Sequence, residues 1–222
     1  MSNIGLFYVG AVLIINGVML LGGMTARAAA PLNLFVGAMQ VFTPTLLVIG
    51  SGGDEAVILA ASGLYLFGFT YLWVGINALA DLPGAGLGWF SLFVAVAAVG
   101  FAANTWLNGG RIFAVIWLLW AVLWLLFFLV LGLGIDRLTR YTGAVALAEG
   151  IATAAVPAWL SLTGAFADSG GAALVFGIAS LVVLVALLPL ARVKRAQAVG
   201  PNAATEPTRV ADQAGSKVAE PA

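Results

Sequence analysis

The chain has 222 residues, of which 63% are hydrophobic and 8% are charged, and its mean hydropathy is +1.11. Because soluble domains carry about 25% charged residues, this composition predicts a protein whose solvent is mostly hydrocarbon. Nine basic residues balance nine acidic ones, so nucleic acid is not expected as a partner. The chain contains no cysteine and no histidine, which excludes disulfides, thiolate chemistry and the commonest general base and metal ligand. We therefore expect neither a cofactor nor a metal site.

Several apolar stretches are long enough to cross a bilayer, which takes about 20 residues per helix. We expect seven spans, at 4–23, 31–50, 56–79, 88–107, 112–133, 142–165 and 171–191. The polar loops between them, such as SGGDE and LNGGR, are too short to hold a soluble domain. The first span lacks a preceding basic segment and a cleavage site, so we interpret it as retained and not as a signal peptide. Residues 196–222 are rich in Ala, Pro and Thr and are predicted to form a disordered tail.

The distribution of lysine and arginine predicts the orientation. An N-terminus outside the cell leaves only Arg111 outside among the short loops. It places the other basic residues near the spans inside, namely Arg27, Arg137, Arg140, Arg192, Lys194 and Arg195. Seven spans then bring the C-terminus inside. The sequence therefore predicts an all-α integral membrane protein with its N-terminus outside and its C-terminus inside.

Small and polar residues within the spans predict close contacts between helices. Many of the 28 glycines lie inside spans, and small residues let transmembrane helices approach closely. Asn16 and Asn77 lie near the inner ends of their spans, where they can bridge helices or contact solute; we favour packing. The segments LNLFVGAMQV (32–41) and FSLFVAVAAV (90–99) resemble each other and hint at repeating two-helix hairpins.

Glu149 is the one charged residue that we place inside a span, in the segment ALAEGIATAAVPAW. An ionised carboxylate at the bilayer centre costs roughly 2.5–3.5 kcal/mol, so this side chain should face the bundle interior or a water-filled path, or stay protonated. Two roles remain open: a structural hydrogen-bond acceptor between helices, or a polar contact for solute or proton. Thr153 lies one turn later on the same face, and Pro157 frees a backbone carbonyl nearby.

Three tryptophans, Trp117, Trp120 and Trp124, lie at i, i+3 and i+7 in WLLWAVLWLLFF and share one helical face. Packing filler and an interfacial belt are alternatives, but the stripe rises about 10 Å, which takes Trp124 too deep for a belt. Phe69 and Trp73, at i and i+4 in the third span, form a second aromatic ledge. Two ledges can enclose a flat slot, where indole faces and indole N–H groups contact a planar amide. Aromatic walls cannot replace the water shell of an ion, so the residues favour a path for small neutral solutes.

These stretches resemble the AmiS/UreI family, which includes proton-gated urea channels and amide transporters. The resemblance covers the first six spans. It is carried by LFYVGAVLIINGV (6–18), LNLFVGAMQV (32–41), LFGFTYLWVGIN (66–77), WFSLFVA (89–95), AVIWLLWAVLWL (114–125) and LAEGIATAAVPAWL (147–160). The resemblance implies a homohexamer in which each protomer carries its own pore and membrane lipid fills the six-fold axis. It divides the chain into a six-span channel domain (1–166), a seventh transmembrane helix with a basic cytoplasmic end (167–195) and the tail (196–222).

The resemblance also implies which residues line the pathway. At the position of Trp73 the family's urea channels commonly carry a tyrosine. The residues that match pathway positions are Leu6, Val9, Leu13, Phe69, Trp73, Trp117, Trp120, Leu123, Trp124 and Glu149. The expected function is a passive channel for urea or short-chain aliphatic amides, or both, in the bacterial inner (cytoplasmic) membrane.

Two features depart from the family's acid-gated urea channels, which titrate histidines and carboxylates in their outer loops. This chain has no histidine and short outer loops, so we expect a pore that is open at neutral pH and suits uptake. The seventh span lies beyond the resemblance. It can seal the ring, bind anionic lipid or dock a cytoplasmic enzyme such as an amidase or a urease, and simple anchoring is the favoured role.

Three other functions remain to be weighed against a channel. A secondary transporter would couple the same solutes to protons through Glu149, with Pro157 marking a broken helix. A membrane amidase is disfavoured, because the chain lacks cysteine, histidine and a lysine near a serine within a span. A structural or assembly protein would leave the permeability of the membrane unchanged.

Overall fold

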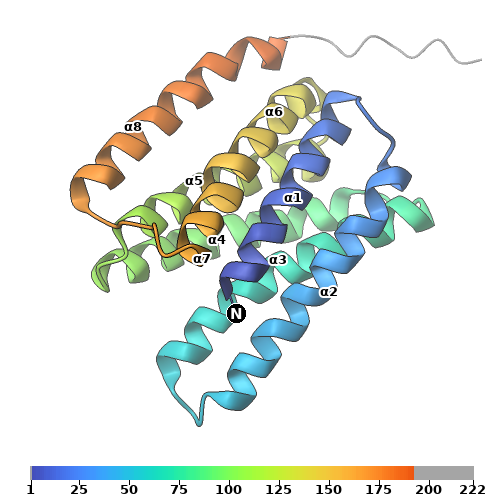
Figure 1. Cartoon of the computed structure of the whole chain (residues 1–222). Coiled ribbons are helices and arrows are strands. Elements are labelled where there is room, and N and C mark those ends of the chain that lie inside the picture. Colours follow the sequence, from blue (N-terminus) through green and yellow to red (C-terminus); the bar gives the residue numbers. More distant parts are fainter. Residues whose placement is uncertain (1, 193–222) are drawn as a thin grey trace, which may run out of the picture.

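The computed structural model describes residues 2–192, so the expected tail at 196–222 and the basic residues Lys194 and Arg195 lie outside the described part. All regular elements between residues 2 and 192 are helical (Figure 1). Seven helical segments are long and apolar enough to cross a membrane: Asn3–Leu21, Ala26–Gly50, Glu55–Ala80, Ala85–Leu107, Arg111–Gly132, Asp136–Leu162 and Gly170–Arg192. The all-α fold with seven apolar helices is thus confirmed. The orientation, with the N-terminus outside and the C-terminus inside, stays a prediction.

The helices follow one another with short turns. They are α1 (Ser2–Leu21), α2 (Ala26–Gly50), α3 (Glu55–Ala80), α4 (Ala85–Leu107), α5 (Arg111–Phe127), α6 (Thr139–Glu149), α7 (Val156–Leu162) and α8 (Gly170–Leu187). Two π-helical segments interrupt this pattern, η1 (Phe128–Gly132) after α5 and η3 (Gly150–Ala155) between α6 and α7. Short 3-10 segments, η2 (Asp136–Leu138) and η4 (Leu188–Arg192), complete the described chain. The fifth, sixth and seventh spans are therefore composite helices.

Polar caps and glycines define the helix ends. The side chains of Thr25, Asp54 and Ser169 each accept a hydrogen bond from a backbone N–H in the first turn of α2, α3 and α8. Such caps satisfy N–H groups that have no partner within the helix. Between α2 and α3 the chain reverses at Gly52 and Gly53, whose φ angles of 61° and 92° favour glycine. The polar punctuation seen in the sequence thus coincides with the turns.

The first six spans form three closely packed pairs: α2 with α3, α4 with α5, and α1 with α6, η3 and α7 (Figure 1). Glycines allow the last pair to approach. Gly10 lies against the backbone of Gly150 and Ala155, and a Cβ atom at Gly10 would lie 2.6 Å from the amide nitrogen of Ala155. Gly17 and Gly143 form a second close contact between the same two spans. Small residues therefore bring α1 against the segment that carries Glu149, as expected for transmembrane packing.

The similar segments of α2 and α4 occupy equivalent positions in their pairs. Val36 and Val94 are 2% and 1% exposed, whereas Phe35 and Phe93 are 73% and 62% exposed. Each segment begins in the first half of its helix, and that helix packs against the next one in the chain, α2 against α3 and α4 against α5. The same residues thus point inward and outward in both hairpins, which supports the repeat proposed from the sequence.

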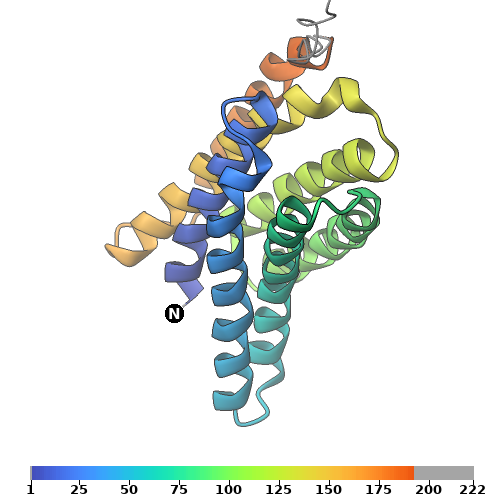
Figure 2. The same ribbon diagram turned by 90° about the vertical axis from the view of Figure 1, so that its right-hand side faces the viewer.

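Two parts of the chain lie outside the six-span bundle. The α2–α3 hairpin extends beyond the other helices at its turn (Figure 2). Helix α8 lies along the side of the bundle (Figure 1), and Ala173 is its only buried residue. Tyr141 donates a hydrogen bond of 3.2 Å to the backbone carbonyl of Leu184 in α8. The seventh span therefore contacts the bundle through few residues and leaves most of its apolar surface for lipid or a neighbouring chain.

Candidate solute pathway

The tryptophan stripe of α5 points into the bundle. Trp124 and Trp120 are 0% and 4% exposed, and Trp117 is half-buried. The rings of Trp117 and Trp120 meet edge to face at a centroid distance of 5.0 Å. The helical spacing therefore predicted correctly that the three indoles share one face, and the structure places that face inside the protein.

Two threonines fix the buried indoles. The Nε1–H of Trp120 donates to Oγ1 of Thr153 at 2.9 Å, and that of Trp124 donates to Oγ1 of Thr70 at 3.2 Å. Each hydroxyl in turn donates to a carbonyl in its own helix, Thr153 to Glu149 at 2.6 Å and Thr70 to Leu66 at 2.8 Å. These indole N–H groups thus have protein partners. The expectation that they donate to a solute carbonyl does not match this geometry for these two rings.

Phe67 of α3 is the residue that faces the stripe. Its ring lies 4.7 Å from that of Trp120, 5.1 Å from that of Trp124 and 5.8 Å from that of Trp117. It also stacks on Tyr71 at 6.4 Å. Phe67, Trp117, Trp120 and Trp124 are called the aromatic cluster below. Aromatic rings at such distances are in attractive contact, so the cluster is a packed group of rings.

Phe69 and Trp73 do not contribute to this cluster. Their side chains are 48% and 36% exposed, and their ring contacts are elsewhere: Phe69 contacts Tyr65 and Trp73 contacts Phe90. The sequence assigned them to the wall because they are one turn apart, but Phe67 and Tyr71 have the same spacing on a different face of α3. The structure therefore does not bring the predicted ledge and the tryptophan stripe together.

The aliphatic residues expected on the pathway do lie beside the cluster. Val9 and Leu13 of α1 are each 1% exposed, and Leu123 of α5 is fully buried, all in one apolar core with Trp120 and Trp124. Leu6 is partly buried and packs against that core. Helix α1 therefore packs against the aromatic cluster.

Glu149 lies at the end of α6, directly before the π-helical segment η3. It is 4% exposed, and neither carboxylate oxygen has a hydrogen-bond partner within residues 2–192. Pro157 follows at the second residue of α7, and π-helical segments within helices are frequent at functional sites. The prediction that Glu149 faces the interior of the bundle agrees with its burial, while its role on a pathway stays a prediction.

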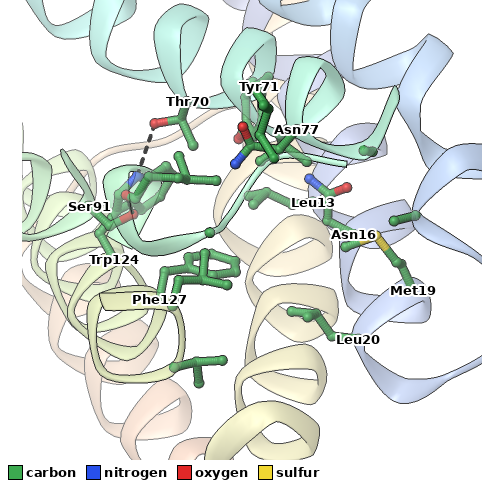
Figure 3. A pocket seen from close by; sticks show the side chains of 18 residues that line it. Leu13, Asn16, Met19, Leu20, Thr70, Tyr71, Asn77, Ser91, Trp124 and Phe127 are labelled. Atoms are coloured by element: carbon green, nitrogen blue, oxygen red, sulfur yellow. Dashed lines mark hydrogen bonds between the residues drawn. The ribbon is translucent and has the colours of Figure 1, made fainter. Parts of the chain in front are cut away.

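A cavity of about 240 Å³ is lined by Trp124, one ring of the aromatic cluster, together with residues of α1 to α5 and η1 (Figure 3). It lies where α1, α3 and α5 end and α2 and α4 begin. Of the residues predicted from the sequence, Leu13 and Trp124 line it. Sequence reasoning missed Phe67, Thr70 and Tyr71, although all three lie in the segment LFGFTYLWVGIN that carries the family resemblance.

The fold and this site define a class: a multi-pass helical membrane protein whose single chain holds a buried aromatic cluster reached from a cavity. The AmiS/UreI family transporter profile matches residues 1–165. The chain belongs to this family. The match ends before α8, so the seventh span lies beyond it.

Relatives of the chain include transporters and urea channels. A candidate transporter of amidate substrates from Mycolicibacterium smegmatis is 56% identical over 86% of this chain and 91% of its own. The candidate transporter AmiS2 of Rhodococcus erythropolis is 52% identical over 83% of this chain and 90% of its own. An acid-activated urea channel of Helicobacter pylori is 34% identical over 72% of this chain and 96% of its own. The crystal structure of the Helicobacter pylori urea channel matches with a TM-score of 0.69 and 32% identity, over 75% of this chain and all of that one.

Proposed function

We propose that each protomer is a passive channel for urea, short-chain aliphatic amides or both, without a histidine gate. The observation that carries this proposal is the aromatic cluster within one chain, with a cavity that ends at Trp124. The names of the relatives, which are urea channels and candidate amide transporters, support the same class of solute. The first two relatives favour amides and the third favours urea, so the proposal includes both.

The packed rings indicate how such a channel would select. Because Phe67 touches all three indoles, a solute passes only if the rings separate by small side-chain rotations. A flat, neutral amide needs the least separation and can contact the ring faces. A hydrated ion would lose its water shell without gaining replacement ligands, so the cluster blocks it. The aliphatic side chains that line this path beside the rings are those of Leu6, Val9, Leu13 and Leu123.

We propose that the channel works as a homohexamer in the bacterial cytoplasmic membrane, as the family resemblance implies. Outward-facing apolar side chains, such as Phe35 at 73% and Phe93 at 62% exposed, support contacts with lipid or with neighbouring protomers. A cytoplasmic amidase or urease that consumes the imported solute is the proposed partner.

Proteoliposomes test the channel directly. We expect stopped-flow light scattering to show faster entry of urea or acetamide than into empty liposomes, to a similar extent at pH 5 and pH 7.5. The chain has no histidine that would change its charge between these values. A rate that is high at pH 5 and falls to that of empty liposomes at pH 7.5 would show an acid gate, and the same rate as empty liposomes at both values would refute the channel.

A second candidate is a transporter that couples the solute to protons through Glu149. The buried carboxylate without a partner and the adjacent π-helical segment favour it. For a passive channel, acetamide entry should not respond to an imposed proton gradient, and the neutral variant Glu149→Gln should retain at least half of the rate. Uphill accumulation driven by the gradient in the wild type, lost in Glu149→Gln, would instead establish coupling.

A further inference from the structure

We propose that Tyr71 and Asn77 form a binding site for the N–H and C=O groups of a primary amide, at the cavity end of the aromatic cluster. The inference rests on the proposed function and names the protein atoms that recognise the solute. Tyr71 supplies its hydroxyl and Asn77 its side-chain carbonyl. Both side chains come from α3 and line the cavity that ends at Trp124 (Figure 3).

The two polar groups are buried without protein partners. Tyr71 is 1% exposed, and its hydroxyl has no hydrogen-bond partner within residues 2–192. The side-chain oxygen of Asn77 is buried and also lacks a partner there. Buried polar groups in proteins are almost always paired, because an unpaired group loses its bonds to water without replacement. Two such groups on residues that line one cavity therefore point to a ligand that pairs with them when small side-chain rotations open their oxygens to the cavity.

The other polar side chains in the cavity wall are already paired. Asn16 and Asn33 exchange two hydrogen bonds of 2.9 and 2.7 Å, which is the helix-bridging role expected for Asn16. Thr70 accepts from Trp124 and donates to a backbone carbonyl, and Ser91 donates to the carbonyl of Leu87 at 2.8 Å. Within the described residues, the buried side-chain oxygens in this wall that lack a hydrogen-bond partner are thus those of Tyr71 and Asn77. The favoured packing role therefore suits Asn16 and does not suit Asn77.

The chemistry of the pair matches a primary amide. The Asn77 carbonyl can accept a hydrogen bond from a solute N–H, and the Tyr71 hydroxyl can donate to the solute carbonyl. A solute loses water when it moves between the rings of Trp124 and Phe67, and these two bonds replace part of that loss. A carboxylate of similar size offers no N–H and carries a charge, so it gains less at the same place. The site thus selects amides before they reach the aromatic cluster.

The test compares Tyr71→Phe, Asn77→Leu and the double variant with the wild type in proteoliposomes, using acetamide and urea. Each lost hydrogen bond should lower the entry rate of both solutes about 3- to 10-fold. Matched controls are Tyr65→Phe on the same helix, whose hydroxyl pairs with Thr45 at 2.7 Å, and Asn104→Leu, which is exposed on α4. Both controls should stay within twofold of the wild type.

The outcomes separate the site from the function. A wild type that passes neither solute faster than empty liposomes refutes the proposed function, and the site with it. A wild type that passes them while the double variant keeps more than half of its rate refutes the site alone. Gel filtration and circular dichroism establish folding for each variant. If Asn77→Leu does not fold, Tyr71→Phe and Asn77→Ser decide the question, since each removes polar groups without adding bulk.

Discussion

Replacement of Phe67 by alanine is expected to abolish discrimination between small and larger amides. Phe67 is 2% exposed and touches all three indoles, so its removal takes away ring contacts between α3 and the tryptophan stripe and widens the proposed path there. The ratio of butyramide to urea entry in proteoliposomes should rise about tenfold or more, because selection here depends on pore diameter. The wild type should pass urea and exclude butyramide.

The matched control is Phe69→Ala, on the same helix and two residues away. Phe69 is 48% exposed and contacts Tyr65 and none of the three indoles, so its loss should leave the selectivity ratio within twofold of the wild type. Loss of selectivity in Phe69→Ala with none in Phe67→Ala would contradict the proposed path and place the route on the face of α3 that carries Phe69. Truncation of a buried phenylalanine costs about 3–5 kcal/mol of stability, so thermal unfolding in detergent must accompany the transport data.

The comparison of these two phenylalanines shows what a sequence pattern can and cannot establish. An i, i+4 pair places two side chains on one face of a helix, but the pattern does not say which face is turned inward. In α3 nearly every residue is apolar, so hydrophobicity does not distinguish the inner face from the lipid face, as it would in a soluble protein. In α5 the three tryptophans themselves defined the face, and the prediction for that helix agrees with the structure.

The spans were predictable because a bilayer requires long apolar helices with satisfied backbone groups. The two largest boundary shifts are in α2, which begins at Ala26 and not near residue 31, and in the sixth span, which begins at Asp136 and not near residue 142. Thr25 caps the earlier start of α2, and Pro31 lies inside that helix although we placed the boundary there. Proline is tolerated in transmembrane helices because neighbouring groups satisfy the backbone that it frees. The charged residue Arg27, which forms a 2.8 Å ion pair with Asp81, thus belongs to the helix.

The pairings that orient the aromatic rings lie beyond sequence reasoning. Trp120 and Thr153 are 33 residues apart, and Trp124 and Thr70 are 54 apart, so no local period connects them. The π-helical segment after Glu149 likewise has no clear signal in the sequence GIATAA. These features depend on how α1, α3, α5 and α6 pack, which the span pattern does not determine. They nevertheless decide which way the indoles face.

Removal of the Thr153 hydroxyl should therefore weaken the aromatic cluster by taking away the hydrogen-bond partner of Trp120. In Thr153→Val the side-chain volume is kept, but the Nε1–H of Trp120 loses its partner in a site where Trp120 is 4% exposed. An unpaired buried donor costs roughly 1–3 kcal/mol, and interhelical hydrogen bonds in membranes lie toward the lower end of that range. We expect a lower unfolding temperature and a change of at least threefold in the entry rate of urea relative to butyramide.

Rescue by Thr153→Ser distinguishes the hydrogen bond from packing. Serine keeps the hydroxyl that accepts from Trp120 and donates to the carbonyl of Glu149, while it loses the methyl group that valine keeps. If the hydroxyl orients the indole, serine restores the selectivity ratio and valine does not. The reverse order would mean that the methyl group fills space beside the cluster and that the indole needs no anchor. Thr163→Val, which also loses a hydroxyl bonded to a carbonyl four residues earlier but has no indole partner, should leave the ratio unchanged. Because Thr153 lies in the π-helical segment that follows Glu149, this comparison also shows whether that segment contributes to transport by holding Trp120 in place.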